Sequence, residues 1–204
     1  MMNIVRSMYH SAVGKNVHRS LIDGYLSKLN TAMNDLNGAE IYDLYKLLKE
    51  ATENDARVFI AGNGGSATTS EHFVTDLGIG SHIRSAKLTV KAYSLNSNVG
   101  VLTALSNDTA YENVFSEQLK SLGPRKSDLV IAISASGNSP NILNLLLAAK
   151  SLGMRTCALT GFDGGKAREL ADLSVHVPTN MNEYGIVEDL HLSICHIVTE
   201  LLRK

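Results

Sequence analysis

Residues 128–152, DLVIAISASGNSPNILNLLLAAKSL, contain a short apolar run, a turn rich in hydroxyl groups and glycine, and an amphipathic segment. The run over residues 128–133 has β-branched residues and little alternation, which is typical of a parallel strand buried on both faces. From Asn141 onward, apolar residues recur at the spacing of one helix face. Pro140 suits the first turn of that helix, because the N–H that proline lacks has no partner there. The stretch therefore predicts a strand, a loop and a helix in that order.

The predicted loop carries three hydroxyl side chains, Ser134, Ser136 and Ser139. Backbone amides at a helix N-terminus point outward at the positive end of the helix dipole, and neighbouring hydroxyls donate further hydrogen bonds to an anion. This pattern predicts phosphate binding. The structural alternative is that Ser139 caps the helix and the other serines only solvate the loop.

A second unit of the same kind begins at residue 57. The short apolar run over residues 57–61 leads into a glycine-rich turn that contains Asn63, Gly64, Gly65 and Ser66, and a helical pattern follows. Glycines let backbone amides approach an anion closely, so the two turns could hold opposite ends of one phosphorylated substrate. Taken alone, the second turn could be a tight turn without a ligand.

Further strands are expected over residues 88–95, 156–160 and 173–177, with helical patterns between them. Strands that alternate with helices predict an α/β fold whose parallel sheet is covered on both faces. Ligands of such sheets bind beyond the carboxyl ends of the strands. A turn at Ser106–Asp108 ends one helix, and Asp108 either caps the next helix or binds substrate.

The first 35 residues have apolar positions at mostly helical spacing, which predicts one or two helices with a break near Gly14. This segment has no strand of its own, so it must bury its apolar stripe on the domain or against another copy of the chain. We favour oligomer formation. Another amphipathic helix is expected to follow Gly38 and to end before Asn54.

The composition indicates one soluble globular domain: 204 residues, 44% hydrophobic, with a net charge of −1. We expect no nucleic-acid or membrane partner, since no general basic field is present. The sequence has no apolar run of ~18 residues and no signal-peptide pattern, so the expected location is the cytoplasm. Cys157 and Cys195 lie in apolar patterns and are expected to be small buried side chains, neither a disulfide nor a zinc site.

Two histidines and two carboxylates form a candidate metal or acid/base set. His72 and Asp76 are four residues apart on one predicted helix face, and Glu188 and His196 on the last helix could complete a set suited to Zn²⁺ or another transition metal. Eight residues of helix span ~12 Å, so Glu188 and His196 reach one ion only with help from helix geometry or a second subunit. Alternatively, His72 and Asp76 are a surface pair, and His191 or His196 is a core histidine.

Five motifs resemble the sugar isomerase (SIS) domain family, in particular its phosphoheptose isomerase group. They are GNGGSATTSEHFVTDL, SND, ISASGNS, ALTGFDGGK and EDLHLSICH, in family order from about residue 40 onward. The resemblance implies a single SIS domain over residues 1–204, with an N-terminal helical segment (1–36) used in oligomerisation and an αβα core (37–204). The implied core is a three-layer sandwich with a five-stranded parallel sheet of flavodoxin-like type. A homotetramer with active sites between subunits is also implied.

The activity implied by the resemblance is aldose–ketose isomerisation of sedoheptulose 7-phosphate to D-glycero-D-manno-heptose 7-phosphate through an enediol. The product would serve the synthesis of heptose for bacterial surface polysaccharide. Catalytic roles fall on Asp76, Glu188 and His196, and a metal, Zn²⁺ or another divalent ion, on these three with His72. The remaining matched positions are expected to bind the substrate or its phosphate: Asn63, Gly64, Gly65, Ser66, Asn107, Asp108, Ser134, Ala135, Ser136 and Ser139.

Several positions depart from the pattern of the family. Asp76 stands where the family usually has glutamate and Glu188 where it usually has glutamine, while Gly80, Ala135 and Gly185 replace an arginine, a threonine and an aspartate. Phosphate capture is compatible with these changes, whereas recognition of the sugar hydroxyls is affected. The alternatives are an isomerase of another phosphorylated sugar and a non-catalytic SIS module that binds a sugar phosphate or a protein. The presence of His196 favours an enzyme, since a non-catalytic module would not need a titratable group at this position.

Overall fold

A computed structural model describes residues 2–80 and 89–204, without the side chains of residues 2–16, 79 and 80. Its centre is a five-stranded sheet in which every neighbouring pair is parallel. The strands are β1 (Arg57–Gly62), β2 (Lys91–Ser94), β3 (Leu129–Ser134), β4 (Arg155–Phe162) and β5 (Leu173–Pro178).

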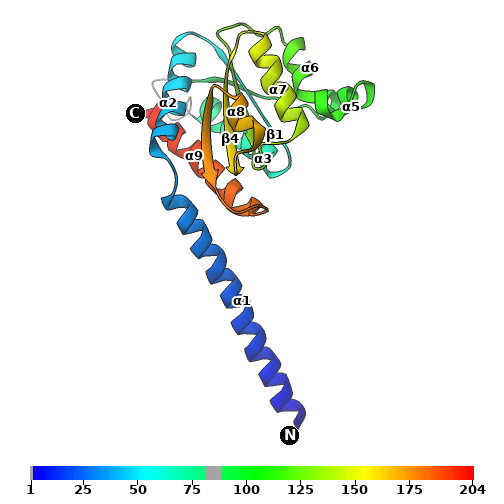
Figure 1. Ribbon diagram of the computed structural model, residues 1–204, viewed down its shortest axis with the longest axis vertical. Helices are drawn as coiled ribbons and strands as arrows, with labels where there is room; N and C mark the ends of the chain where they lie inside the picture. The colour runs from blue at the N-terminus through cyan, green and yellow to red at the C-terminus, as the bar shows by residue number, and fades with distance from the viewer. Residues whose placement is uncertain (1, 81–88) are drawn as a thin grey trace.

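Helices cover both faces of the sheet, and one long helix projects from the body of the molecule (Figure 1). The projecting helix is α1 (Met2–Asn34). The helices of the body are α2 (Gly38–Glu53), α3 (Gly65–Thr75), α5 (Val99–Asp108), α6 (Val114–Ser121), α7 (Pro140–Ser151), α8 (Gly165–Leu170) and α9 (Tyr184–Arg203). A π-helical turn, η1 (Asp76–Gly80), extends α3, and a 3₁₀ turn, η2 (Tyr111–Asn113), precedes α6.

Alternate residues of the strands enter two separate cores. Val58 and Ile131 belong to one core, which also contains apolar side chains of α2, α3 and α9. Phe59 and Val130 belong to the other, with side chains of α6 and α7. Because successive side chains of a strand point to opposite faces, both faces of the sheet are buried. The predicted three-layer αβα fold with a five-stranded parallel sheet is confirmed.

The strand order is β2-β1-β3-β4-β5, which is the flavodoxin-like order. The chain runs from β1 outward to β2 and then returns to the other side of β1 to form β3. The direction of winding therefore changes between β1 and β3. The crevice at the carboxyl ends of these two strands is where open α/β sheets bind ligands.

Three predicted boundaries differ from the structure. The turn predicted at residues 106–108 is wrong, because α5 continues through Asp108 and the amide of Thr109 still donates to the carbonyl of Leu105. Asp108 caps no following helix, since η2 has Ala110 at its N-cap. Helix α1 is unbroken at Gly14, where a glycine costs only about 1 kcal/mol relative to alanine. Residue 88, at the start of the strand predicted over 88–95, lies outside the described residues.

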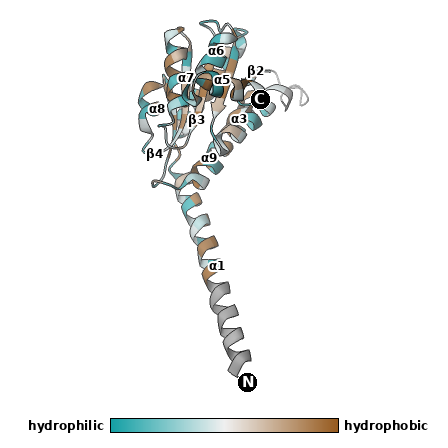
Figure 2. Cartoon of the chain, turned by 90° about the vertical axis from the view of Figure 1, so that its right-hand side faces the viewer, coloured by the Kyte–Doolittle hydropathy of each residue, from teal (hydrophilic) through white to brown (hydrophobic). Residues whose placement is uncertain are grey.

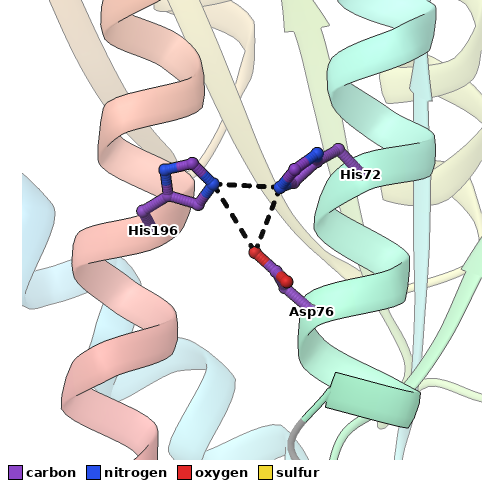
Figure 3. A group of neighbouring side chains, drawn as sticks. All are labelled: His72, Asp76 and His196. Atoms are coloured by element: carbon purple, nitrogen blue, oxygen red, sulfur yellow. Dashed lines mark hydrogen bonds and ion pairs between the residues drawn. The ribbon is translucent and has the colours of Figure 1, made fainter.

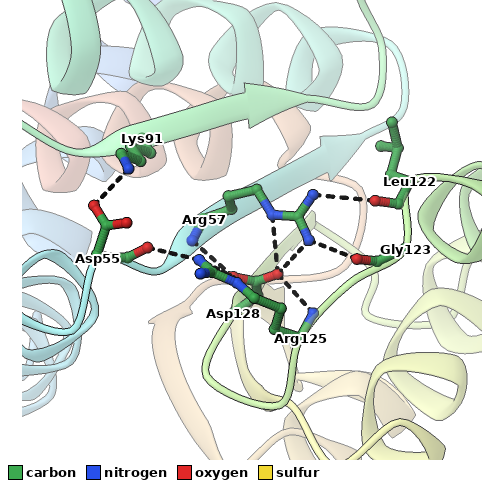
Figure 4. A network of polar contacts seen from close by, with 7 residues as sticks. All are labelled: Asp55, Arg57, Lys91, Leu122, Gly123, Arg125 and Asp128. Atoms are coloured by element: carbon green, nitrogen blue, oxygen red, sulfur yellow. Dashed lines mark hydrogen bonds and ion pairs between the residues drawn. The ribbon is translucent and has the colours of Figure 1, made fainter.

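A buried carboxylate joins the amino ends of β1 and β3 (Figure 4). The fully buried side chain of Asp128 accepts hydrogen bonds from the Arg57 guanidinium, at 2.7 and 3.0 Å, and from the backbone amides of Arg57 and Arg125. Burial alone would raise the pKa of Asp128, but the hydrogen bonds from Arg125 and Arg57 outweigh it and hold this pKa below the usual value. The Arg57 guanidinium also donates to the carbonyls of Leu122 and Gly123, which fixes the loop before β3.

Both cysteines are buried and free, as predicted for Cys157 and Cys195. Burial raises the pKa of each thiol. Over the part of the chain that the structure describes, no helix is both long enough and apolar enough to cross a membrane.

A fully buried histidine joins α9 to the sheet. The Nε2 of His191 lies 3.2 Å from the carbonyl oxygen of Thr160 on β4, so we assign its ring proton to Nε2. Its Nδ1 is buried and has no hydrogen-bond partner among the described atoms. Burial lowers the pKa of His191 from 6.5 to about 4, because the charged ring would lose its hydration.

Acid is therefore expected to destabilise the fold through His191. The unfolded chain takes up this proton near pH 6.5 and the folded protein only near pH 4, so stability present above pH 6.5 is lost as the pH falls. The loss is about 3 kcal/mol at pH 4. Denaturant unfolding across this range should show a shallower pH dependence for His191→Gln than for the wild type. The exposed-site control His18→Gln should keep the wild-type slope; equal slopes for all three proteins would contradict the assignment.

Candidate functional site

A cavity of about 300 Å³ lies at the carboxyl ends of β1 and β3, where the two glycine- and serine-rich loops meet. Helix α9 closes it with Tyr184 and Glu188. We call this cavity the serine pocket. Its remaining lining residues are Asn63, Gly64, Gly65, Ser66, Ile133, Ser134, Ala135, Ser136 and Ser139.

The serine loop presents hydroxyl groups at the N-terminus of α7. Ser139 occupies the N-cap position, yet its side chain makes no capping hydrogen bond and its Oγ lies 3.5 Å from the Oγ of Ser134. The capping alternative for Ser139 is thus not what the structure has. Ser134 accepts a hydrogen bond from the amide of Gly137, which closes the loop. This arrangement suits a phosphate group at a helix N-terminus.

The glycine loop faces the serine loop across the pocket. Gly64 has a φ of 55° at the N-cap of α3, a left-handed conformation that favours glycine. The neighbouring Gly65 leaves room for Glu188, because a Cβ at residue 65 would overlap the Glu188 carboxylate. Ser66 is buried in the first turn of α3. The pocket thus has two helix N-termini, of which that of α3 lies beside a carboxylate.

A second cluster lies farther along the same two helices. His72 on α3 and His196 on α9 point toward each other, and the carboxylate of Asp76 lies between them (Figure 3). The two Nε2 atoms are 2.9 Å apart, and the Oδ2 of Asp76 lies 3.3 Å from that of His72 and 3.7 Å from that of His196. We call these residues the His–Asp–His cluster.

The His–Asp–His cluster fits a divalent ion by its donor set and its spacing. Imidazole nitrogen and carboxylate oxygen are ordinary Zn²⁺ ligands, and a tetrahedral ion with bonds of 2.0–2.1 Å separates its ligands by about 3.3 Å. The three ligand atoms lie within 4.8 Å of one another. Both histidine side chains are about half exposed, so the cluster is open on one side.

The structure does not bring Glu188 into this cluster. Among the described residues, the metal-binding group that includes His196 contains only His72 and Asp76 besides it. Glu188 and His196 both belong to the continuous helix α9, eight residues and about 12 Å apart. The four-ligand set that we expected is therefore not assembled within one chain, and Glu188 lines the serine pocket instead.

Helices α3 and α9 run side by side in the same direction. Gly65 meets Glu188 near their N-terminal ends, and His72 meets His196 further along both. The rise from residue 65 to residue 72 is about 10 Å. The serine pocket and the His–Asp–His cluster are therefore two ends of one strip of surface formed by these helices.

Other predicted positions fall outside the serine pocket. Asn107 and Asp108 are exposed at the end of α5, where the Asn107 amide donates to the Asp108 carboxylate at 3.1 Å, and neither lines the pocket. Gly80 lies in η1. Gly185 faces the hydroxyl of Tyr25, which donates to Asp189 at 2.6 Å, and this hydrogen bond raises the pKa of Tyr25 to about 12.

Sequence reasoning missed two residues that hold Asn63. Asn141 is buried at the start of α7 and exchanges two hydrogen bonds of 2.9 Å with the side chain of Asn63. The hydroxyl of Tyr111 donates to the same Asn63 oxygen at 2.9 Å. Asn141 could have been noticed as an amide beside Pro140, at a position where the helix turns its inner face to the sheet. No signal in the sequence singles out Tyr111.

Comparison with known proteins agrees with this fold. A family model of the SIS domain matches residues 24–161. The chain belongs to the SIS domain family. Within the family it falls among the phosphoheptose isomerases. It is 39% identical over 155 residues to "Phosphoheptose isomerase" of Helicobacter pylori strain HPAG1, which covers 76% of this chain and 78% of the relative.

Two further relatives cover more of the chain. "Phosphoheptose isomerase" of Chlorobium limicola is 34% identical over 180 residues, which are 88% of this chain and 83% of the relative. The solved structure of phosphoheptose isomerase from Neisseria gonorrhoeae superposes with a TM-score of 0.80 at 27% identity, over 92% of this chain and 97% of that one. The protein is accordingly an isomerase of the phosphosugar class.

Gly137 provides a test of the serine loop. It has a φ of 61°, and a Cβ there would overlap the carbonyl oxygen of Gly164. Gly137→Ala should displace the loop and weaken phosphosugar binding by more than about tenfold, because the hydroxyls and amides would no longer converge. Isothermal titration calorimetry measures this change.

The matched control is Gly123→Ala. Gly123 has a similar φ of 55°, but a Cβ there meets nothing within 4 Å. It should cost about 1 kcal/mol of stability and leave phosphosugar binding as in the wild type. Wild-type binding by Gly137→Ala would contradict the role of the serine loop.

Proposed function

We propose that the protein isomerises sedoheptulose 7-phosphate to D-glycero-D-manno-heptose 7-phosphate, a step that supplies heptose for bacterial surface polysaccharide. The observation that carries the proposal is that a phosphate-type pocket and a carboxylate–imidazole cluster lie on the same two helices. The names of the relatives support the choice of a heptose phosphate.

The phosphate of the substrate binds in the serine loop, where Ser134, Ser136 and Ser139 surround the N-terminus of α7. Helix dipole, amides and hydroxyls act there together on a dianion. The carboxylate of Glu188 faces the same pocket, so it disfavours a second anionic group and accepts hydrogen bonds from sugar hydroxyls. Binding of the phosphate in the serine pocket positions the reacting carbons of the sugar at the His–Asp–His cluster.

The reacting carbons, C1 and C2, are at the end of the chain remote from the phosphate on C7. The His–Asp–His cluster is correspondingly about two helical turns from the serine pocket. Asp76 is therefore the better placed of the two candidate carboxylates to take the proton beside the carbonyl. His196 supplies a proton to the carbonyl oxygen on C2, which gives the enediol. Asp76 then returns its proton to C2, and His196 takes back a proton from the hydroxyl on C1.

A divalent ion, Zn²⁺ by the donor set, would be held by His72, Asp76 and His196, and it would then replace the His196 proton as the group that faces the carbonyl oxygen. When bound, such an ion polarises a carbonyl oxygen and stabilises the negative charge that develops on it. The chain's own contribution is to hold the two imidazoles and the carboxylate at fixed spacing on two packed helices.

A second candidate is isomerisation of a different phosphorylated sugar in the same pocket. Two observations favour it. Ala135 lines the pocket without the hydroxyl that the family usually has there, and Gly185, where the family usually has an aspartate, directly follows Tyr184, which lines the pocket. Both changes affect contacts with the sugar and leave the serine loop intact. A panel of aldose and ketose phosphates distinguishes the two candidates by relative kcat/KM.

We further propose that the chain assembles through α1 into a homotetramer with active sites between subunits, in the cytoplasm. Along the described part of α1, apolar side chains are exposed to solvent. The colours of Figure 2 show that hydrophobic and hydrophilic residues are interspersed along this helix. These apolar residues are Val17, Leu21, Ile22, Leu26 and Met33. An exposed apolar stripe of this kind is typical of a subunit contact. A monomer in sedimentation analysis would contradict assembly through α1.

Loss of isomerase activity on substitution of the cluster tests the proposed reaction. His196→Ala and Asp76→Asn should each lower kcat for conversion of sedoheptulose 7-phosphate by about 100-fold or more, since each removes a proton-transfer group. The control is Asp43→Asn, which changes an exposed carboxylate on α2 outside the site. Appearance of aldoheptose phosphate is followed in metal-supplemented buffer. A folded wild type that binds the phosphosugar but forms no product at any metal loading would refute the heptose assignment.

Zinc titration against a competing chelator tests the composition of the metal site. His72→Ala and His196→Ala should weaken zinc binding by about tenfold or more, because each removes one of three ligands. Glu188→Gln should leave the zinc affinity unchanged, since Glu188 lines the serine pocket. An affinity loss in Glu188→Gln as large as that in His196→Ala would show that Glu188 is a ligand after all.

A further inference from the structure

The side chain of Asn63 is held on three sides at the rim of the serine pocket. Its Oδ1 accepts hydrogen bonds from the Asn141 amide and from the Tyr111 hydroxyl, each at 2.9 Å. Its Nδ2 donates to the Oδ1 of Asn141 at 2.9 Å. A carbonyl oxygen has two lone pairs and an amide nitrogen two hydrogens. The oxygen of Asn63 is thus fully used, and one N–H remains.

This accounting fixes what Asn63 can offer a ligand. With its oxygen occupied, the side chain presents only a hydrogen-bond donor to the pocket that it lines. A donor at this point matches an oxygen of the ligand, whether phosphate, carbonyl or hydroxyl, and Asn63 cannot accept a hydroxyl proton there. The Asn63–Asn141 pair alone does not determine this, because both amides could reverse together and keep their two hydrogen bonds. Tyr111, donating to the oxygen, stabilises the observed arrangement.

Tyr111 is itself held in place by α7, the helix that begins at the serine loop. The amide of Asn144 on α7 donates to the carbonyl of Glu112 at 3.0 Å and to the side chain of Asn113 at 3.3 Å, so the turn η2 is fixed to this helix. The ring of Tyr111 is 57% exposed, which means that its hydroxyl contact is not a by-product of core packing. Helix α7 therefore holds the turn η2, and η2 in turn holds the glycine loop through the hydrogen bond from Tyr111 to Asn63.

We propose that Tyr111 is a positioning residue that acts through Asn63 and Asn141 to direct an N–H group of the glycine loop at the phosphorylated ligand. This inference rests on the proposed function for the identity of the ligand, a sugar phosphate. It extends the ligand-binding surface to a residue that meets the substrate only through another side chain.

The experiment is a double-mutant cycle on ligand affinity. Calorimetry gives the dissociation constants of sedoheptulose 7-phosphate and of inorganic phosphate for the wild type, Tyr111→Phe, Asn63→Ala and the double variant. Tyr111→Phe removes one hydroxyl and keeps the ring, and it should weaken sugar phosphate binding roughly threefold to tenfold. In the Asn63→Ala background the same change should have no further effect, because the two residues act as a unit.

The control is Tyr42→Phe, which removes the hydroxyl of another exposed tyrosine, on α2. It should bind as the wild type does. Asn63→Ser provides a second background for the cycle in which the residue stays polar. Wild-type affinity in Tyr111→Phe, or an equal loss with and without Asn63, would overturn the inference; the second result would mean that Tyr111 contacts the ligand directly.

Failure of the proposed function is a separate outcome. A wild type that binds the phosphosugar without isomerising it, and still shows coupling between Tyr111 and Asn63, would refute the reaction and support the positioning role. Normal isomerisation, with effects of the Tyr111 and Asn63 substitutions on affinity that simply add, would support the reaction and refute the positioning role. A wild type that binds neither ligand would overturn the positioning role as well.

Discussion

The contact between α3 and α9 determines both halves of the site. Near the N-terminal ends of the two helices Glu188 lies against Gly65, where a Cβ would overlap the Glu188 carboxylate, the movable end of that side chain. Below this contact, Phe73 of α3 and Leu190 and Ile194 of α9 are fully buried in the same core. Two closely packed helices that run in one direction then carry the serine pocket at one end and the His–Asp–His cluster at the other. The packing of these two helices thus sets the distance between phosphate binding and proton transfer.

The architecture could be predicted from the sequence because both faces of the sheet are buried. Runs such as residues 129–133 stay apolar throughout, and the intervening helices have clear apolar faces, so each element leaves its own signal. The end of α5 was mistaken because Ser106, Asn107 and Asp108 favour turns, whereas the helix hydrogen bonds continue past them. The helix therefore continues about one turn beyond the end that these residues predict.

The site was predictable in part. Glycine and serine at the ends of neighbouring strands indicate a phosphate pocket, and a four-residue spacing places His72 and Asp76 on one face. The partnership of His196 with them depends on how two helices far apart in sequence pack, which spacing alone does not give. The same limit applies to Glu188: the helical pattern of the last segment does not tell whether this residue faces the serine pocket or the His–Asp–His cluster. Tyr111 and Asn141 form hydrogen bonds across 48 and 78 residues of sequence, and no local pattern reports such contacts.

The Arg57–Asp128 network lies at the amino ends of β1 and β3, and the serine pocket lies at their carboxyl ends. The two are separated by the length of the strands and share no side chain. Substitutions in the pocket therefore replace no member of the charge network, and substitutions in the network replace no residue that lines the pocket. The residues at the carboxyl ends of the strands can therefore change during evolution while those at the amino ends keep the chain folded. One fold can in this way come to serve many substrates.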